Sequence, residues 1–185
     1  MILAGLPLIL ALASPARSVE APVSKPRSEI RALASFSGPA GWLEEEDEVL
    51  GDPLVRFSSG PYTVRVSLFG GKKSRHETPA AFLSDFEALG EGDKPPGKLG
   101  LARVGAKKYP AYRRRYEVSG RDPHAGGPPG IPETIQDDFV IVPAGERFFV
   151  LTLKTRLSPA YEPDKSGELA WKRLLETFKL KKPKR

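Results

Sequence analysis

Cysteine is absent from the 185 residues of this sequence. Its absence excludes disulfide bonds, thiolate metal sites, cysteine nucleophiles and a lipid-modified cysteine after a leader peptide. The G-x-S-x-G pattern of a nucleophile elbow is also missing. The stretch Gly70-Gly-Lys-Lys-Ser74 lacks the earlier glycine that a phosphate-binding Walker loop requires. No catalytic motif therefore stands out.

Histidine is nearly as scarce, since only His76 and His124 could serve as imidazole bases or metal ligands. Each lies in a predicted loop, where a solvated side chain is the expected state. His124 has Asp122 two residues away, but two ligands do not complete a tetrahedral metal site. Asp137 and Asp138 are adjacent on a predicted strand and face opposite sides, so they cannot share one substrate as acid and base. The sequence predicts a protein that is not an enzyme and has no cofactor or metal.

No apolar run reaches the roughly 20 residues that span a bilayer. The most apolar stretch is Met1–Ala13, which ends in Ala11-Leu12-Ala13, an A-x-A cleavage pattern, although no Lys or Arg precedes it. A buried N-terminal strand is the alternative, and Gly5 and Pro7 disfavour it. Residues 1–18 are predicted to be a signal peptide. The mature protein is expected to be exported, soluble, periplasmic or extracellular, and without a lipid anchor.

Positive charge is concentrated at the C-terminus. The chain has 29 Lys and Arg against 23 Asp and Glu, a net charge of +6. Five of these basic residues follow Phe178, and without them the balance is 24 to 23. The body of the protein therefore lacks the basic excess of a nucleic-acid surface, and a nucleic-acid partner is not expected.

A single folded domain is predicted over residues 35–180. Hydrophobic content of 39% and charged content of 28% are ordinary for a folded soluble protein, and the length suits one core. Residues 19–34 show no periodicity and are expected to form a flexible linker. Residues 181–185 are expected to form a basic tail, beyond a last helix that frays. The acidic run Glu44–Glu48 is expected to be a solvated loop or the start of a helix.

Alternation of apolar and polar residues predicts an antiparallel sheet. In residues 62–68 the residues Tyr62, Val64, Val66 and Leu68 share one face. Residues 135–142 and 147–157 form a predicted hairpin around the turn 143–146, and its second strand is apolar on both sides, as expected of a central strand. The other predicted strands are 53–58, 99–107 and 109–118, the last two joined by a turn at 106–110.

Two helices are predicted. Thr78 and Pro79 form an N-cap and first-turn signal, and apolar residues at helical spacing follow as far as Gly90. The second helix runs from Ser166 to Leu180, with one apolar stripe that must lie on the sheet: Trp171, Leu174, Leu175 and Phe178.

These elements resemble the PsbP-like family, named for an extrinsic subunit of photosystem II. The resemblance covers residues 36–180. It rests on the Phe36…Gly41-Trp42 entry, the strand 62–68, the Thr-Pro helix cap, the hairpin at 139–151, and Tyr161 before the last helix. It implies an α+β fold with a central antiparallel sheet sandwiched by helices, a non-enzymatic role, and association with a larger partner. It carries over no metal or catalytic position, and the Gly/Pro-rich loop 119–132 and the acidic run depart from it.

Arginines 113–115 are the main candidate for a binding surface. Arg113 and Arg115 share one face of the predicted strand 109–118, and Arg65 and Lys154 lie on strands expected to neighbour it. A basic strip for an acidic partner is one interpretation, and protection of an edge strand by charge is the other. Arg114 lies between two tyrosines on its own face, which predicts a stacking or cation–π contact.

The predicted function is binding: an exported accessory protein of the cell envelope that associates with a larger protein partner. The alternative is docking on an envelope surface or anionic ligand through the basic C-terminus, with weak contact to an anionic membrane. The candidate binding residues are all basic: Arg65, Arg113, Arg114, Arg115, Lys154, Lys179, Lys181, Lys182, Lys184 and Arg185.

Overall fold

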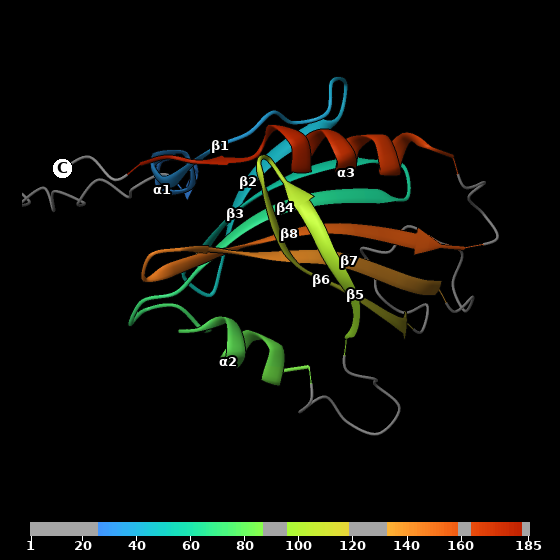
Figure 1. Cartoon of the computed structure of the whole chain (residues 1–185). Helices are drawn as coiled ribbons and strands as arrows, with labels where there is room; N and C mark the ends of the chain where they lie inside the picture. The colour runs from blue at the N-terminus through green and yellow to red at the C-terminus, as the bar shows by residue number, and fades with distance from the viewer. Residues whose placement is uncertain (1–25, 87–95, 119–132, 159–163, 183–185) are drawn as a thin grey trace, which may run out of the picture.

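A seven-stranded antiparallel sheet forms the centre of the molecule (Figure 1). The computed structural model describes residues 26–86, 96–118, 133–158 and 164–182. In space the strands follow the order β2-β3-β4-β8-β7-β6-β5. Their bounds are β2 (Leu43–Val49), β3 (Asp52–Ser59), β4 (Tyr62–Phe69), β5 (Gly97–Val104), β6 (Lys107–Val118), β7 (Glu133–Ala144) and β8 (Arg147–Leu157).

The β7–β8 hairpin lies at the middle of this sheet, as its apolar residues on both sides predict. Its strands pair from Thr134–Leu157 to Ala144–Arg147. The loop of two residues contains Gly145 with φ of +73°, a backbone conformation that suits a residue without Cβ. The turn between β5 and β6 lies at 105–106, so it begins one residue earlier and ends four residues earlier than the predicted 106–110.

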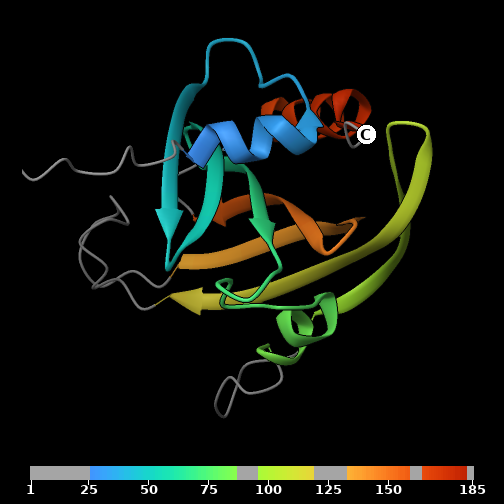
Figure 2. The same ribbon diagram turned by 90° about the vertical axis from the view of Figure 1, so that its left-hand side faces the viewer.

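The main core lies on the sheet face covered by α1 (Pro26–Leu33) and α3 (Ser166–Thr177), which we call the α3 face (Figure 2). In β4 the predicted alternation is confirmed, because Tyr62, Val64, Val66 and Leu68 are all buried in this core. From the last helix, Ala170, Leu174 and Phe178 are buried against them, whereas Trp171 and Leu175 are only half-buried. The predicted stripe is thus rotated slightly away from Trp171.

The opposite face, which we call the α2 face, is covered only in part by the described residues. The short helix α2 (Pro79–Ser84) begins after Thr78, whose Oγ1 accepts a hydrogen bond from the Ala81 N–H at 3.1 Å. Phe82 packs from this helix against Phe69, Phe139 and Phe148. The predicted α+β fold with an antiparallel sheet is confirmed, but helices cover its two faces unequally. The helix ends well before the predicted Gly90, which lies outside the described residues.

Folded structure begins earlier than predicted. The expected linker 19–34 contains helix α1, in which Ile30 is fully buried in the main core. Arg31 stacks on the Phe36 ring with its guanidinium carbon 4.0 Å from the centroid, and Glu29 forms a 3.0 Å ion pair with Arg147 of β8. Tertiary contacts therefore stabilise a helix of eight residues that is too short to form by propensity alone.

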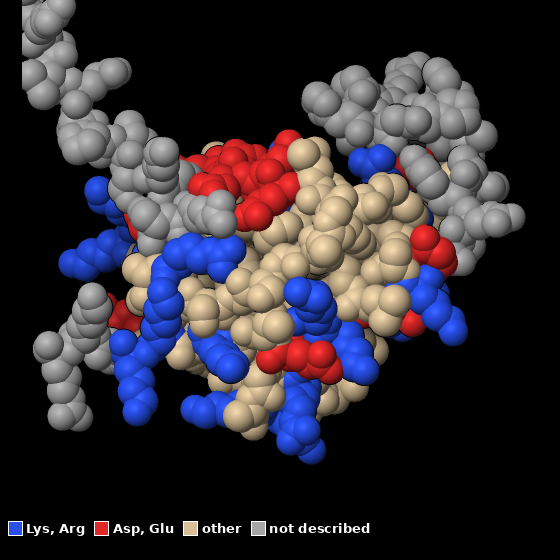
Figure 3. All heavy atoms as spheres, turned by 90° about the horizontal axis from the view of Figure 1, so that it is seen from above, with Lys and Arg blue, Asp and Glu red and all other residues tan. Residues whose placement is uncertain are grey.

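The acidic run Glu44–Glu48 also differs from the prediction, because it forms the edge strand β2. Its register places Glu45 opposite Arg56 of β3, and their side chains meet at 2.7 Å. Pairing with β3 therefore overrides the low strand propensity of acidic residues, and the charge protects an exposed edge. Figure 3 shows one large group of acidic side chains in this view of the molecule, with other acidic side chains lying among the lysines and arginines.

The C-terminal end of the last helix does not fray. The helix stops at Thr177, three residues before the predicted Leu180, and the chain continues as β9 (Lys179–Leu180), which pairs with β1 (Ala34–Ser35). The Lys181 N–H then donates to the Leu33 carbonyl at 2.8 Å. The predicted fraying of the last helix is wrong, because backbone hydrogen bonds hold residues 179–181 beside β1 and α1. No helix in the described segments is both long and apolar enough to cross a membrane.

Candidate functional site

Charged side chains converge on the α2 face, beside the part of it that α2 covers. The register aligns Lys154 of β8, Asp137 of β7 and Arg114 of β6 in one row across three neighbouring strands. Arg65 lies on β4, the neighbour of β8, and interacts electrostatically with Asp137. The Tyr116 side chain forms a hydrogen bond with Asp137. We call these five residues the Asp137 cluster.

The cluster combines one carboxylate with three cations, and all its members are half-buried. With Asp137 ionised, the three cations leave a net charge of +2. The Nε of Arg65 and the Oδ1 of Asp137 are buried, and neither makes a hydrogen bond within the described part of the chain. Buried polar atoms normally have partners, so these two atoms are exceptions within the described segments.

Burial is the dominant influence on the two acidic groups of the cluster. It raises the pKa of Asp137 above its ordinary value, while Arg65, Lys154, the Tyr116 hydrogen bond and Arg114 act in the opposite direction. Burial, with Asp137 as a second cause, raises the pKa of Tyr116 to about 12. Tyr116 therefore stays protonated at neutral pH and can donate its hydroxyl proton to the carboxylate.

Arg114 is positioned by aromatic rings. Its guanidinium carbon lies 4.6 Å from the Tyr116 ring centroid and 5.1 Å from that of Phe86, just after α2. The predicted cation–π contact with a flanking tyrosine is confirmed. Since such contacts hold the planar guanidinium in a defined orientation, α2 helps to shape the cluster.

The structure corrects which arginines lie together. Arg113 and Arg115 occupy the α3 face, not the face of Arg65 and Lys154. Arg113 donates two hydrogen bonds to Asp138, at 2.6 and 2.8 Å, and Arg115 donates to Gln136 at 2.8 Å. Asp137 and Asp138 do face opposite sides, as predicted.

The interpretation of β6 as an edge strand is also wrong. β6 lies between β7 and β5, and the edges of the sheet are β2 and β5. Charge on Arg113–Arg115 therefore does not serve to protect an edge. Sequence periodicity places residues on faces of a strand, but it does not show which strands are neighbours.

The basic C-terminal residues that the structure describes do not join this cluster. Lys179 and Lys182 are exposed, and the Lys181 ammonium donates to the Arg31 carbonyl at 2.5 Å at the end of α1. Strand β9, which contains Lys179, lies on the other side of the molecule from α2 (Figure 1). Lys184 and Arg185 lie outside the described residues.

His76 is buried, not solvated as predicted. It is only 6% exposed and lies edge-on to Phe69 and Phe82, each ring centroid 5.1 Å away. Its Nδ1 is 3.2 Å from the Asp85 carboxylate, and burial lowers its pKa. Its role is to pack α2 against the sheet. His124 and Asp122 lie outside the described residues, within which no group of three or more metal-ligating side chains occurs.

Comparison with known proteins does not place the chain in a family. No protein-family model matches it, and no curated protein matches its sequence. The prediction of a PsbP-like protein stays a prediction.

Two solved structures resemble the chain weakly. One is a protein from Bacteroides thetaiotaomicron VPI-5482, with 16% identity and a TM-score of 0.45, covering 81% of this chain and 46% of that one. The other is LpqN of Mycobacterium tuberculosis, described as involved in cell envelope biogenesis, with 15% identity and a TM-score of 0.36, covering 80% and 82%. The chain thus spans about half the length of the Bacteroides protein.

Proposed function

We propose that this protein is a non-catalytic accessory protein of the cell envelope that binds an acidic partner protein through the Asp137 cluster. The observation that carries the proposal is the arrangement of Arg65, Arg114 and Lys154 around a single carboxylate on the α2 face. The envelope location comes from the predicted leader peptide, and association with a larger partner is what the PsbP-like resemblance implies.

Charge balance favours an acidic partner. Half-buried cations lose part of their hydration, so further negative charge close to them is favourable. Carboxylates of a partner would supply negative charge, and an arginine can bind a carboxylate through two parallel hydrogen bonds. The three cations of the cluster therefore favour a partner with acidic side chains.

Binding, not catalysis, suits the groups present. The Tyr116 pKa of about 12 keeps its proton in place near neutral pH, while general acid–base catalysis works best with a pKa near the operating pH. Asp137 accepts the tyrosine hydrogen bond and spaces the surrounding cations. The cluster thus acts as a fixed positive surface.

The test is recovery of the partner from the native envelope by crosslinking and co-purification. The variant Arg65→Gln/Arg114→Gln/Lys154→Gln/Asp137→Asn removes the charge, and its asparagine avoids leaving an unpaired buried carboxylate. The matched control Arg113→Gln/Arg115→Gln removes two charges from the same strand on the opposite face. We expect the amount of partner recovered with the cluster variant to be at least tenfold lower than with the wild type. The control variant should recover as much partner as the wild type.

Equal recovery by the cluster variant and the control would refute the proposal, provided that both variants show the wild-type circular dichroism spectrum. Recovery of a partner without an acidic surface would refute it as well. Partner binding should weaken as salt rises, because exposed charge interactions are screened over about 8 Å at physiological ionic strength.

A further inference from the structure

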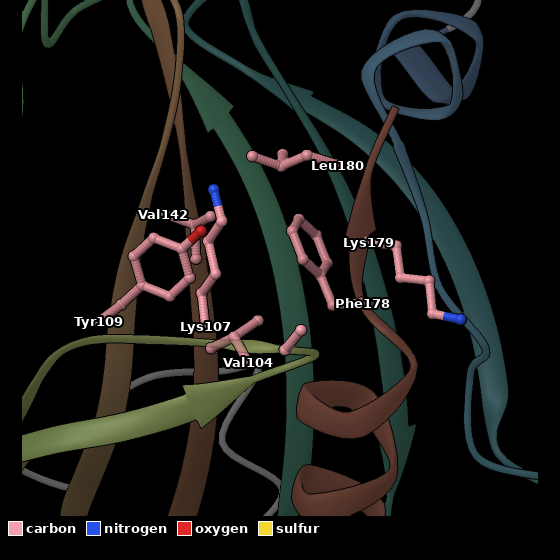
Figure 4. Close-up of a pocket in the computed structure, with 8 residues that line it drawn as sticks. Val104, Lys107, Tyr109, Val142, Phe178, Lys179 and Leu180 are labelled. Carbon is pink, nitrogen blue, oxygen red and sulfur yellow. The ribbon is translucent and has the colours of Figure 1, made fainter. Parts of the chain in front are cut away.

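A preformed hollow lies on the α3 face, where the β5–β6 turn meets the end of α3 (Figure 4). It measures about 210 Å³. Its apolar lining includes Val104, Val142, Phe178 and Leu180, and Lys107 and Tyr109 line it as polar residues. The Asp137 cluster is on the opposite face of the sheet, so the hollow is a separate site.

The walls of the hollow are held by backbone contacts. The Gly105 N–H donates to the Leu175 carbonyl at 2.8 Å, which ties the β5–β6 turn to α3. A Cβ at Gly105 would lie 2.8 Å from the Phe178 carbonyl oxygen, so only glycine allows this close approach. On the other wall, pairing of β9 with β1 fixes Leu180. The hollow therefore exists without a ligand to organise it.

A second hollow of about 690 Å³ adjoins Leu180. Leu33, Ala144 and Leu180 line it together with Lys181 and Lys182. Leu180 is 37% exposed and contributes to both hollows. Among the described residues that line either hollow, none is acidic. The combined surface is apolar with positive charge at its margins.

We infer that this surface binds a single-chain amphiphile with an anionic head, of the fatty-acid class. An apolar cavity of about 150 Å³ is large enough to bind benzene, so the first hollow can hold the carboxyl-proximal part of an alkyl chain. The remainder of the chain passes Leu180 into the second hollow. Burial of each methylene favours binding by about 0.8 kcal/mol.

The head group is assigned to Lys107 and Tyr109. In Figure 4 the Lys107 amine and the Tyr109 hydroxyl both lie near Val142, whereas the Lys179 amine points away from the hollow. An ammonium and a phenol can both donate to one carboxylate. Lys107 is exposed and forms no ion pair with an acidic side chain of the described residues, which leaves it able to pair with a ligand.

The test uses decanoate as the probe, below its micelle-forming concentration. Calorimetry gives its affinity, and amide chemical shifts of labelled protein give its location. We expect shifts at Val104, Phe178 and Leu180. Lys107→Met keeps the apolar stem but removes the charge, and it should weaken decanoate binding about tenfold. Lys108→Met, the adjacent exposed lysine on the other side of β6, is the matched control and should bind as the wild type does.

Two uncharged or chainless probes complete the experiment. We expect 1-decanol to bind at least fivefold more weakly than decanoate, and acetate not to bind. The inference is overturned if the wild type does not bind decanoate, if Lys107→Met and Lys108→Met bind it equally, or if 1-decanol binds as tightly as decanoate. None of these outcomes involves the Asp137 cluster, so they leave the proposed partner interaction unaffected.

Discussion

The two faces of the sheet have different compositions although the same strands supply both. Along β8, the α3 face presents Phe149, Leu151 and Leu153, all buried. On the α2 face the side chains of β8 go from apolar to charged along the strand, in the order Phe148, Val150, Thr152 and Lys154. The neighbouring strands show the same progression: Phe69 to Arg65 in β4, Phe139 to Asp137 in β7, and Tyr112 to Arg114 in β6.

This difference separates the stabilising part of the molecule from the candidate binding part. The α3 face carries the main apolar core, which α1, α3 and the β1–β9 pair cover, and its charged side chains include Arg113, Arg115 and Asp138. The α2 face is apolar only beneath α2 and becomes charged along the strands. A sheet can present a charged cluster on one face without loss of its core, because its side chains alternate between faces.

The largest expected effect concerns the α3 face. Leu174→Ala removes a fully buried side chain from the main core, and we expect it to lower the free energy of unfolding by about 2–5 kcal/mol. Denaturant titration measures this change. Leu169→Ala, on the same helix but 64% exposed, should change it by less than about 0.5 kcal/mol. A similar cost for both would mean that α3 is not packed as described.

A smaller effect is expected at Trp171. The sequence alone assigns this ring to the core, with a cost of about 3–5 kcal/mol for its truncation. Since Trp171 is only half-buried, we expect Trp171→Ala to lower the free energy of unfolding by about 1–2 kcal/mol. The measurement is the same denaturant titration. A loss greater than that of Leu174→Ala would place Trp171 in the core after all.

The packing of α2 should depend on pH through His76. Burial lowers its folded-state pKa, so below the unfolded value of about 6.5 the unfolded chain binds the proton more readily and stability falls as pH falls. The stabilisation from neutral His76 is fully present above pH 6.5. We expect the melting temperature to fall between pH 7.5 and 5.5 by more in the wild type than in His76→Gln. Equal falls would show that His76 does not contribute.

The smallest effect is expected from the exposed arginines of the α3 face. Arg113 is bound to Asp138 near the surface, and exposed ion pairs contribute about 0–1 kcal/mol. Arg113→Gln/Arg115→Gln should therefore lower the free energy of unfolding by less than about 1 kcal/mol, measured by denaturant titration. A larger loss would mean that the two faces depend similarly on their charges.

The structure also changes how the C-terminal basic residues should be tested for membrane contact. Truncation at Lys179 would remove β9 as well as charge, so weaker binding to anionic vesicles could not be assigned to charge. Removing residues 183–185 leaves the β1–β9 pair intact and tests Lys184 and Arg185 directly. At about 1 kcal/mol per basic residue, the affinity for anionic vesicles should fall measurably at low salt and not at high salt.

The sequence by itself determined the elements whose signal is local. Alternation in β4, the apolar character of β8 and the Thr78 cap depend on residues a few positions apart, and each predicted the observed element. The opposite orientations of Asp137 and Asp138 follow from the same period of two. These features can be predicted from the sequence because they depend only on residues that are close together along the chain.

Only the tertiary structure decided which residues meet. Arg65, Arg114, Asp137 and Lys154 come from four strands, and only their pairing and register bring them into one cluster while sending Arg113 and Arg115 to the other face. Contacts distant in sequence also decide four other features: helix α1, the acidic strand β2, the backbone pairing of residues 179–181, and the burial of His76. Local patterns fix the direction of a side chain, but strand order and register fix its neighbours, and the candidate site depends on the neighbours.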